Sequence, residues 1–232
     1  NYIPHGNKNN VAYAIIWKIE MKKYILIIIL VAILILAFLF YKKSNSKPAE
    51  TNIASYRNSS LGISFQYPKK LKVTGTTSSI KIHHEVPFEH HDYCDFKGEA
   101  TTTIKNLTDF NVEMHLVNQS IIKAMKTESP YIPEENFLNG KIVVSPGFID
   151  PVTFGNLKGY SIFEGAEGCG HTIYYFEIES EKTLVVTNDF ITIFSGAIDT
   201  ENMDRALAVP DVINKQSATS IFESIVNSLK VE

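Results

Sequence analysis

The sequence predicts an α+β domain with a mainly antiparallel sheet flanked by helices, preceded by a single transmembrane helix. Short segments that alternate apolar and polar residues, separated by turn residues, indicate the strands. A long apolar run near the N-terminus indicates the membrane span. An apolar stripe at helical spacing close to the C-terminus indicates a helix that covers the sheet.

The apolar run Tyr24–Tyr41 contains no charged or polar residue between its two tyrosines. At 1.5 Å per residue it spans roughly 27 Å, close to the hydrocarbon thickness of a bilayer. Lysines flank both ends, and the tyrosine rings favour the interface. No small-residue cleavage pattern follows the run. These features predict an uncleaved signal anchor that contacts the lipid bilayer.

Four segments follow from this anchor. Residues 1–20 form an N-terminal tail, which either lies upstream of a start at Met21 or belongs to a fragment of a longer chain, and residues 21–43 form the anchor. Residues 44–55 are polar and predict a linker. Residues 56–232 form an extracytoplasmic α+β domain. A short N-terminus before a long domain favours a bacterial single-pass protein of the cytoplasmic membrane, with its C-terminal domain outside.

The chain is slightly acidic, with a formal net charge of −3. Most of its acidic residues follow the apolar run, so the domain itself is the more negative part. An acidic surface repels phosphate backbones and anionic lipid headgroups. Nucleic acid is therefore not an expected partner, whereas an envelope protein or a small ligand is.

The pattern in the first half of the domain predicts several strands followed by one helix. Residues 61–66 and 78–86 alternate apolar and polar side chains, and Pro68 ends the first of these strands. Residues 100–104 are rich in β-branched residues, and residues 110–117 alternate again. The pattern then changes to a short helix, for which Ser120 is the expected N-cap.

The second half again predicts alternating strands, and it ends in the helix with the most regular apolar stripe. Residues 157–165 and 171–178 read as strands, and a turn at 179–182 leads into the strand 183–189, which predicts a hairpin. The helix over 218–230 carries one apolar stripe, formed by Ala218, Ile221, Phe222, Ile225 and Leu229.

Both ends of this domain resemble PsbP-like domains, which occur in many membrane-tethered bacterial proteins of unknown function. The opening matches their pattern at Gly62, Ser64, Phe65, Tyr67 and Pro68, with Ile63 and Leu71 in place of the usual Phe and Trp. The closing helix is similar at Ile221, Phe222, Ile225 and Lys230. The resemblance implies an antiparallel sheet sandwiched by helices, and it implies no catalytic residues.

The two cysteines, Cys94 and Cys169, lie in polar segments rich in turn residues. An even pair outside the cytoplasm favours a disulfide, which would contribute roughly 4 kcal/mol in the chain-entropy model. Two free thiols, or two metal ligands, are the alternatives.

The segment "KIHHEVPFEHHDYC" suggests a metal site. Zinc needs three or four ligands that converge on one point. Neighbouring strand residues point to opposite faces, so only one of His83 and His84 can join a site. His84 falls on the apolar face. A disulfide would remove both thiolates, leaving a zinc or copper site of His83, His90, His91 and His171 as the hypothesis.

Recognisable catalytic motifs are absent from the sequence. It contains no Gly-x-Ser-x-Gly, His-Glu-x-x-His or phosphate-binding loop. This favours an accessory or ligand-binding domain without catalysis and without a cofactor. The alternative is a zinc- or copper-dependent binding protein or enzyme that uses the histidine-rich segment.

Overall fold

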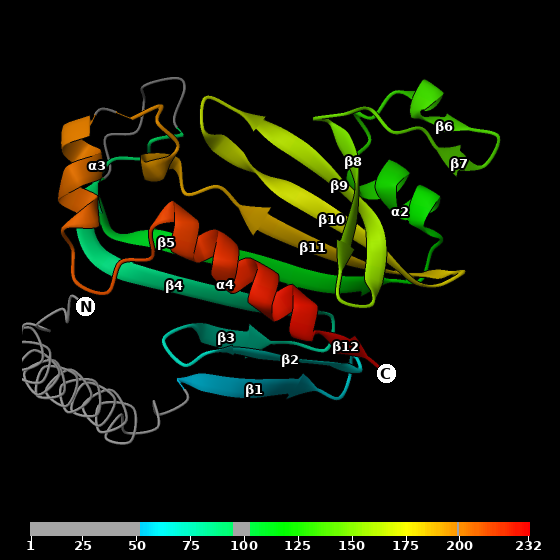
Figure 1. Ribbon diagram of the computed structural model, residues 1–232, viewed down its shortest axis with the longest axis horizontal. Coiled ribbons are helices and arrows are strands. Elements are labelled where there is room, and N and C mark those ends of the chain that lie inside the picture. Colours follow the sequence, from blue (N-terminus) through cyan, green and yellow to red (C-terminus); the bar gives the residue numbers. More distant parts are fainter. Residues whose placement is uncertain (1–51, 95–102, 199) are drawn as a thin grey trace, which may run out of the picture. The chain divides into compact units, whose positions relative to one another are not determined.

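The computed structural model describes residues 52–94, 103–198 and 200–232. The chain divides into two compact units, Asn1–Thr51 and Asn52–Glu232, and the described residues all belong to the second. Its centre is a seven-stranded antiparallel sheet (Figure 1). The order across this sheet is β3 (Lys72–Gly75), β4 (Ser79–His90), β5 (Ile104–Val117), β11 (Lys182–Asp189), β10 (Cys169–Glu179), β9 (Leu157–Ala166) and β8 (Ile149–Phe154).

Two smaller sheets accompany the large one. A three-stranded sheet joins the two ends of the unit, because β2 pairs with both β1 and the C-terminal β12. A two-stranded ribbon lies in the segment between α2 and β8. The strands are β1 (Ile53–Asn58), β2 (Ile63–Pro68), β12 (Lys230–Val231), β6 (Phe137–Leu138) and β7 (Lys141–Ile142). Since β1 begins at Ile53, the end of the expected linker 44–55 belongs to a strand.

Three α-helices and two 3₁₀ turns occur in the described part of the chain. They are α2 (Ile121–Glu128), η1 (Glu134–Asn136), η2 (Thr192–Phe194), α3 (Thr200–Leu207) and α4 (Lys215–Ser228). The N-cap of α2 is Ser120, as its position before the apolar pattern indicates. The N-cap of α4 is Asn214, whose side chain accepts a hydrogen bond from the Ser217 amide at 2.8 Å.

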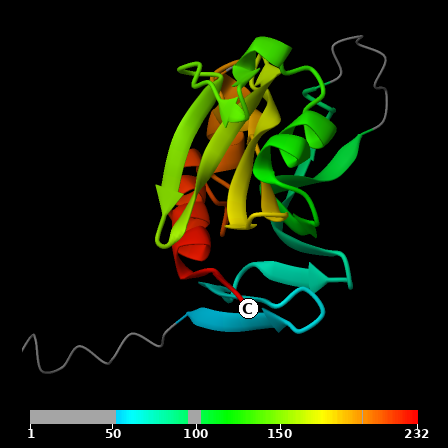
Figure 2. The same ribbon diagram turned by 90° about the vertical axis from the view of Figure 1, so that its right-hand side faces the viewer.

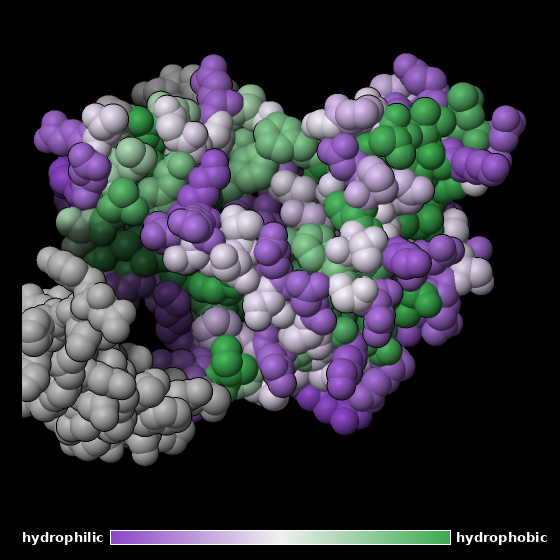
Figure 3. Space-filling model, viewed as in Figure 1, coloured by the Kyte–Doolittle hydropathy of each residue, from purple (hydrophilic) through white to green (hydrophobic). Residues whose placement is uncertain are grey.

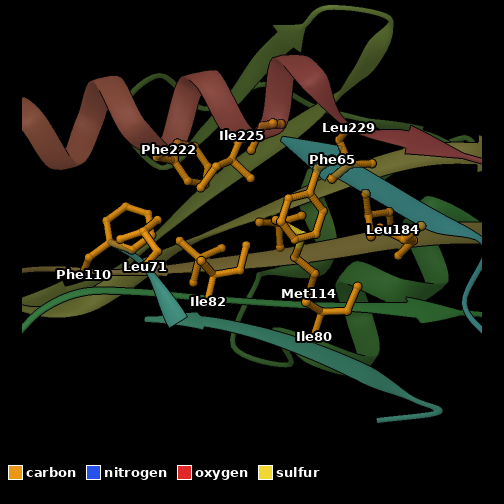
Figure 4. Packing of buried hydrophobic residues seen from close by; sticks show 14 of the residues in the cluster. Phe65, Leu71, Ile80, Ile82, Phe110, Met114, Leu184, Phe222, Ile225 and Leu229 are labelled. Carbon is orange, nitrogen blue, oxygen red and sulfur yellow. The ribbon is translucent and has the colours of Figure 1, made fainter. Parts of the chain in front are cut away.

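The large sheet lies between α4 and α2, as Figure 2 shows. Alternation along β11 explains this arrangement, because successive strand residues point to opposite faces. Leu184 and Val186 pack in the core under α4, whereas Val185 packs with Met125 of α2. Figure 4 shows Phe222 and Ile225 of α4, with Leu229 directly after the helix, in the first of these cores.

A third apolar cluster fills the end of the sheet beyond the α4 core. It joins the far ends of β4 and β5 to η2 and α3, through Val86, Phe88, Leu107, Ile193, Phe194 and Ala206. The 3₁₀ turn η2 and the helix α3 are therefore held on the sheet by this cluster.

The predicted transmembrane helix and single-pass membrane location are wrong for the part of the chain that the structure describes. No helix there has both the length and the apolar character needed to cross a membrane. The longest, α4, has 14 residues and a length of about 21 Å, and it carries polar residues on its exposed face. The expected anchor, Tyr24–Tyr41, lies outside the described residues. The fold class is corrected to a mostly antiparallel sheet with α4 on one face and α2 on the other.

Candidate functional site

A cavity of about 370 Å³ lies between the N-terminal half of α4 and the sheet. Its volume falls within the range of roughly 300–1,000 Å³ that small-molecule sites occupy. Strands β5, β9 and β11, together with the loop after β11, supply the other walls. The lining residues are Phe110, Asn111, Phe163, Gly168, Asn188, Asp189, Phe190, Ile191, Ser195, Lys215, Ala218 and Thr219.

Three phenylalanines contribute to the walls of this cavity. Phe110 is buried at its base. Phe163 and Phe190 stack with their ring centroids 5.0 Å apart and an interplanar angle of 26°. Phe163 is 49% exposed, so the aromatic wall reaches the surface. Figure 3 shows apolar side chains gathered at this end of the viewed face. An exposed aromatic side chain at a cavity of this size is typical of a ligand site.

A buried carboxylate fixes the start of α4 beside the cavity. Asp109 occupies a β-bulge, where the pairing of β4 with β5 shifts register, and it is fully buried. One carboxylate oxygen lies 2.7 Å from Nδ1 of His84, and the other accepts a hydrogen bond of 2.6 Å from the backbone amide of Ile213. Ile213 immediately precedes the N-cap of α4, so the sheet positions the helix directly.

The sequence reasoning did not single out Asp109. It placed His84 on the apolar face of its strand, and the structure places it there, largely buried. A carboxylate in the otherwise regular segment "LTDFNV" was the available signal, because buried charges need partners.

A disulfide lies beside the turn that carries the lining residue Gly168. Cys94 and Cys169 are bonded, with their Cα atoms 5.7 Å apart. The hydroxyl of Thr192 lies 3.3 Å from the Cys94 sulfur, which connects the disulfide to η2. Gly168, next to Cys169, adopts φ +83°, and a β-carbon there would lie 2.1 Å from Oγ of Ser195. Only glycine allows this close approach between two cavity walls.

The four histidines of the alternative metal-site hypothesis lie at separate places. His83 and His171 share the face of the sheet away from α4, in one row with Asn111 and Asp189 between them. Three strand spacings therefore separate them, which is about 14 Å. This is far beyond the separation of two ligands on one zinc ion.

His90 and His91 lie at the end of β4, away from that row. Both ring nitrogens of His90 lie within hydrogen-bond distance of backbone carbonyl oxygens, those of His91 and Asn106, and its ring stacks on Tyr93. Among the described residues, no three His, Cys, Asp or Glu side chains form a group that could hold a metal. Zinc or copper binding stays the alternative hypothesis, which metal titration would test.

His171 instead ends a hydrogen-bonded chain of side chains. Its Nε2 lies 3.2 Å from a carboxylate oxygen of Glu164, which accepts a hydrogen bond of 3.0 Å from the Tyr131 hydroxyl. Tyr131 continues to Ser129, and Ser129 to the hydroxyl of the buried Tyr175. Burial raises the pKa of Tyr175 far above its ordinary value of 10.0. This chain ties the α2 side of the sheet together and does not line the cavity.

The row that contains His83 has two buried polar atoms without a hydrogen-bond partner among the described residues. They are Nδ1 of His83 and Oδ1 of Asn111. Burial, together with the positive charges of Lys72 and Lys81, lowers the pKa of His83 below its ordinary value of 6.5. The structure therefore favours the neutral imidazole at this position.

The fold and the cavity together define a class of protein, a small antiparallel-sheet domain with an aromatic cavity under its C-terminal helix. No family model and no curated protein matches the chain. The chain is similar to a solved chain from Bacteroides thetaiotaomicron VPI-5482, with 8% identity and a TM-score of 0.39 over 77% of this chain and 48% of that one. It thus spans about half the length of that protein. The resemblance to PsbP-like domains stays a prediction.

Proposed function

We propose that this chain is a ligand-binding domain that holds a small organic molecule in the cavity beneath α4, without catalysing a reaction on it. The observation that carries the proposal is the cavity itself, with its volume of about 370 Å³ and its wall of phenylalanines. A well-formed apolar cavity with a few polar groups is the default binding site of a small domain.

The walls of the cavity are held by contacts that do not depend on a ligand. Asp109 fixes the start of α4, and the disulfide of Cys94 with Cys169 fixes the turn that carries Gly168. A site built in advance loses less conformational entropy when a ligand enters it, which favours binding.

Filling the cavity tests this proposal. Ala218 of α4 lines the cavity, so Ala218→Trp would occupy the space a ligand needs. Gln216→Trp places the same ring on the exposed side of the same helix, outside the lining, and is the matched control. The probe is 8-anilinonaphthalene-1-sulfonate, whose fluorescence rises in apolar sites.

We expect saturable, one-to-one binding of the probe by the wild-type chain and by Gln216→Trp, and at least a tenfold weaker affinity in Ala218→Trp. Urea unfolding of each protein, followed by circular dichroism, is the control that both variants are folded. Equal binding by all three folded proteins would place the probe elsewhere and contradict the proposal.

A further inference from the structure

Two charged residues line the cavity among those that the structure describes, Asp189 and Lys215. The two side chains point in different directions. Asp189 shares the face of β11 that carries Val185, away from α4, and its carboxylate accepts a hydrogen bond of 2.5 Å from the Asn111 amide. The negative charge is therefore turned away from the α4 side, where the phenylalanines lie.

Lys215 has the opposite position. It is the first residue of α4, on the same side of the sheet as the aromatic wall, and its side chain is exposed at the rim. A lysine ammonium is a flexible, hydrated point charge that can follow a ligand's charged group without being buried. The charge available to an occupant of this cavity is thus positive.

The rest of the lining is suited to a flat, apolar body. Phe110 lies at the base, and the stacked rings of Phe163 and Phe190 line the side. Aromatic rings prefer offset-stacked or edge-to-face contact with other rings. Asn188, on the α4 side of β11, and Thr219 supply polar groups between the base and the rim.

We propose that the occupant is a small organic anion, with a flat apolar body against the phenylalanines and a carboxylate or sulfonate group beside Lys215. This inference rests on the proposed function, since it names the class of ligand for the same cavity. An ammonium ligand of the same shape would meet the charge of Lys215, while the buried carboxylate of Asp109 is outside the lining and already contacts His84 and the Ile213 amide.

The test compares three compounds that share one ring system and differ in the charge of the head. They are 2-naphthaleneacetate, 2-(2-naphthyl)ethanol and 2-(2-naphthyl)ethylamine, each titrated calorimetrically into the full chain. The variants are Lys215→Ala, Lys215→Arg, which keeps the charge, and Lys123→Ala, which removes an exposed lysine from α2 outside the cavity lining. Ala218→Trp reports whether a bound compound occupies the cavity.

We expect the anion to bind about threefold to tenfold more tightly than the alcohol, and the amine to bind most weakly. Lys215→Ala should abolish the preference for the anion while leaving the alcohol unchanged. Lys215→Arg and Lys123→Ala should retain the preference.

Two kinds of result would separate a failure of the charge inference from a failure of the proposed function. If the alcohol or the amine binds as tightly as the anion, and Ala218→Trp blocks it, the cavity binds ligands but the inference about charge is wrong. An anion preference that persists in Lys215→Ala would also refute the inference. If none of the three compounds binds in a way that Ala218→Trp weakens, the proposed function fails, and the inference with it.

Discussion

Replacing Asp109 with alanine should destabilise the domain strongly. Its carboxylate is fully buried and joins two elements that are far apart in the chain, β4 through His84 and the start of α4 through Ile213. Leaving the buried Ile213 amide without an acceptor costs about 1–3 kcal/mol. The His84 ring nitrogen, 2.7 Å from the carboxylate, also loses its partner, and a hydrogen bond to a carboxylate contributes about 1.5–3 kcal/mol. Because the two terms overlap, we expect a loss of about 3 kcal/mol in the free energy of unfolding.

The assay is urea unfolding at pH about 7, with the matched variant Asp150→Ala beside it. Asp150 also accepts hydrogen bonds from a backbone amide, that of Gly147, but at 3.1 and 3.2 Å and at the surface. Its loss should cost less than about 1 kcal/mol. Asp109→Asn keeps an oxygen acceptor and should lie between the two. If Asp109→Ala costs no more than Asp150→Ala, the bulge carboxylate does not hold α4, and the reasoning fails.

Three further predictions concern the disulfide and two titrating groups. The two cysteines are 75 positions apart in the sequence, so Cys94→Ser should lower the free energy of unfolding by about 4 kcal/mol. Native protein should show no thiol that reacts with an alkylating agent before reduction, and two reactive thiols would refute the bond. Because the pKa of His83 is lowered from 6.5, the unfolded chain binds the proton first as the pH falls, so this contribution to stability is present above pH about 6.5 and is lost below it. His83→Gln should therefore reduce the fall in the urea midpoint between pH about 7 and about 5.5. An equal fall in the variant and the wild type would contradict the shift. The pKa of Tyr175 is raised, so the contribution of Tyr175 to stability is present below pH about 10 and is lost as the pH rises above that value. Tyr175→Phe should flatten the dependence of stability on pH above about 10 and cost about 1 kcal/mol at neutral pH. A Tyr175→Phe curve parallel to that of the wild type would contradict the raised pKa.

Strands with clear alternation could be predicted from the sequence, and others could not. The apolar face of β4 at Ile80 and Ile82 and the return of the hairpin at residues 179–182 lie where the pattern places them. The short strand β3 was missed because four residues give too little periodicity to recognise. The length of β5 was missed because the bulge at Asp109 interrupts its alternation.

The site was harder to predict than the sheet. The histidine-rich segment attracted attention because of its composition, yet strand pairing distributes its side chains over separate places. The cavity, by contrast, is lined by ordinary residues such as Phe110, Phe163 and Ala218, which come from three distant segments. No local spacing signals such a site, since it exists only after β5, β9 and α4 have packed together.

The contacts that shape the cavity are long-range, and this has a consequence for binding. The hydrogen bond from Ile213 to Asp109 spans 104 residues, and the disulfide spans 75. Each adds a fixed point to one wall of the cavity, the start of α4 in the first case and the turn at Gly168 in the second. The conformational entropy of ordering these walls is therefore lost on folding, before any ligand arrives. A ligand that enters then gains contact with Phe110, Phe163 and Phe190 without that cost, so changes at Asp109 or at the disulfide should weaken ligand binding even though neither of them touches the ligand.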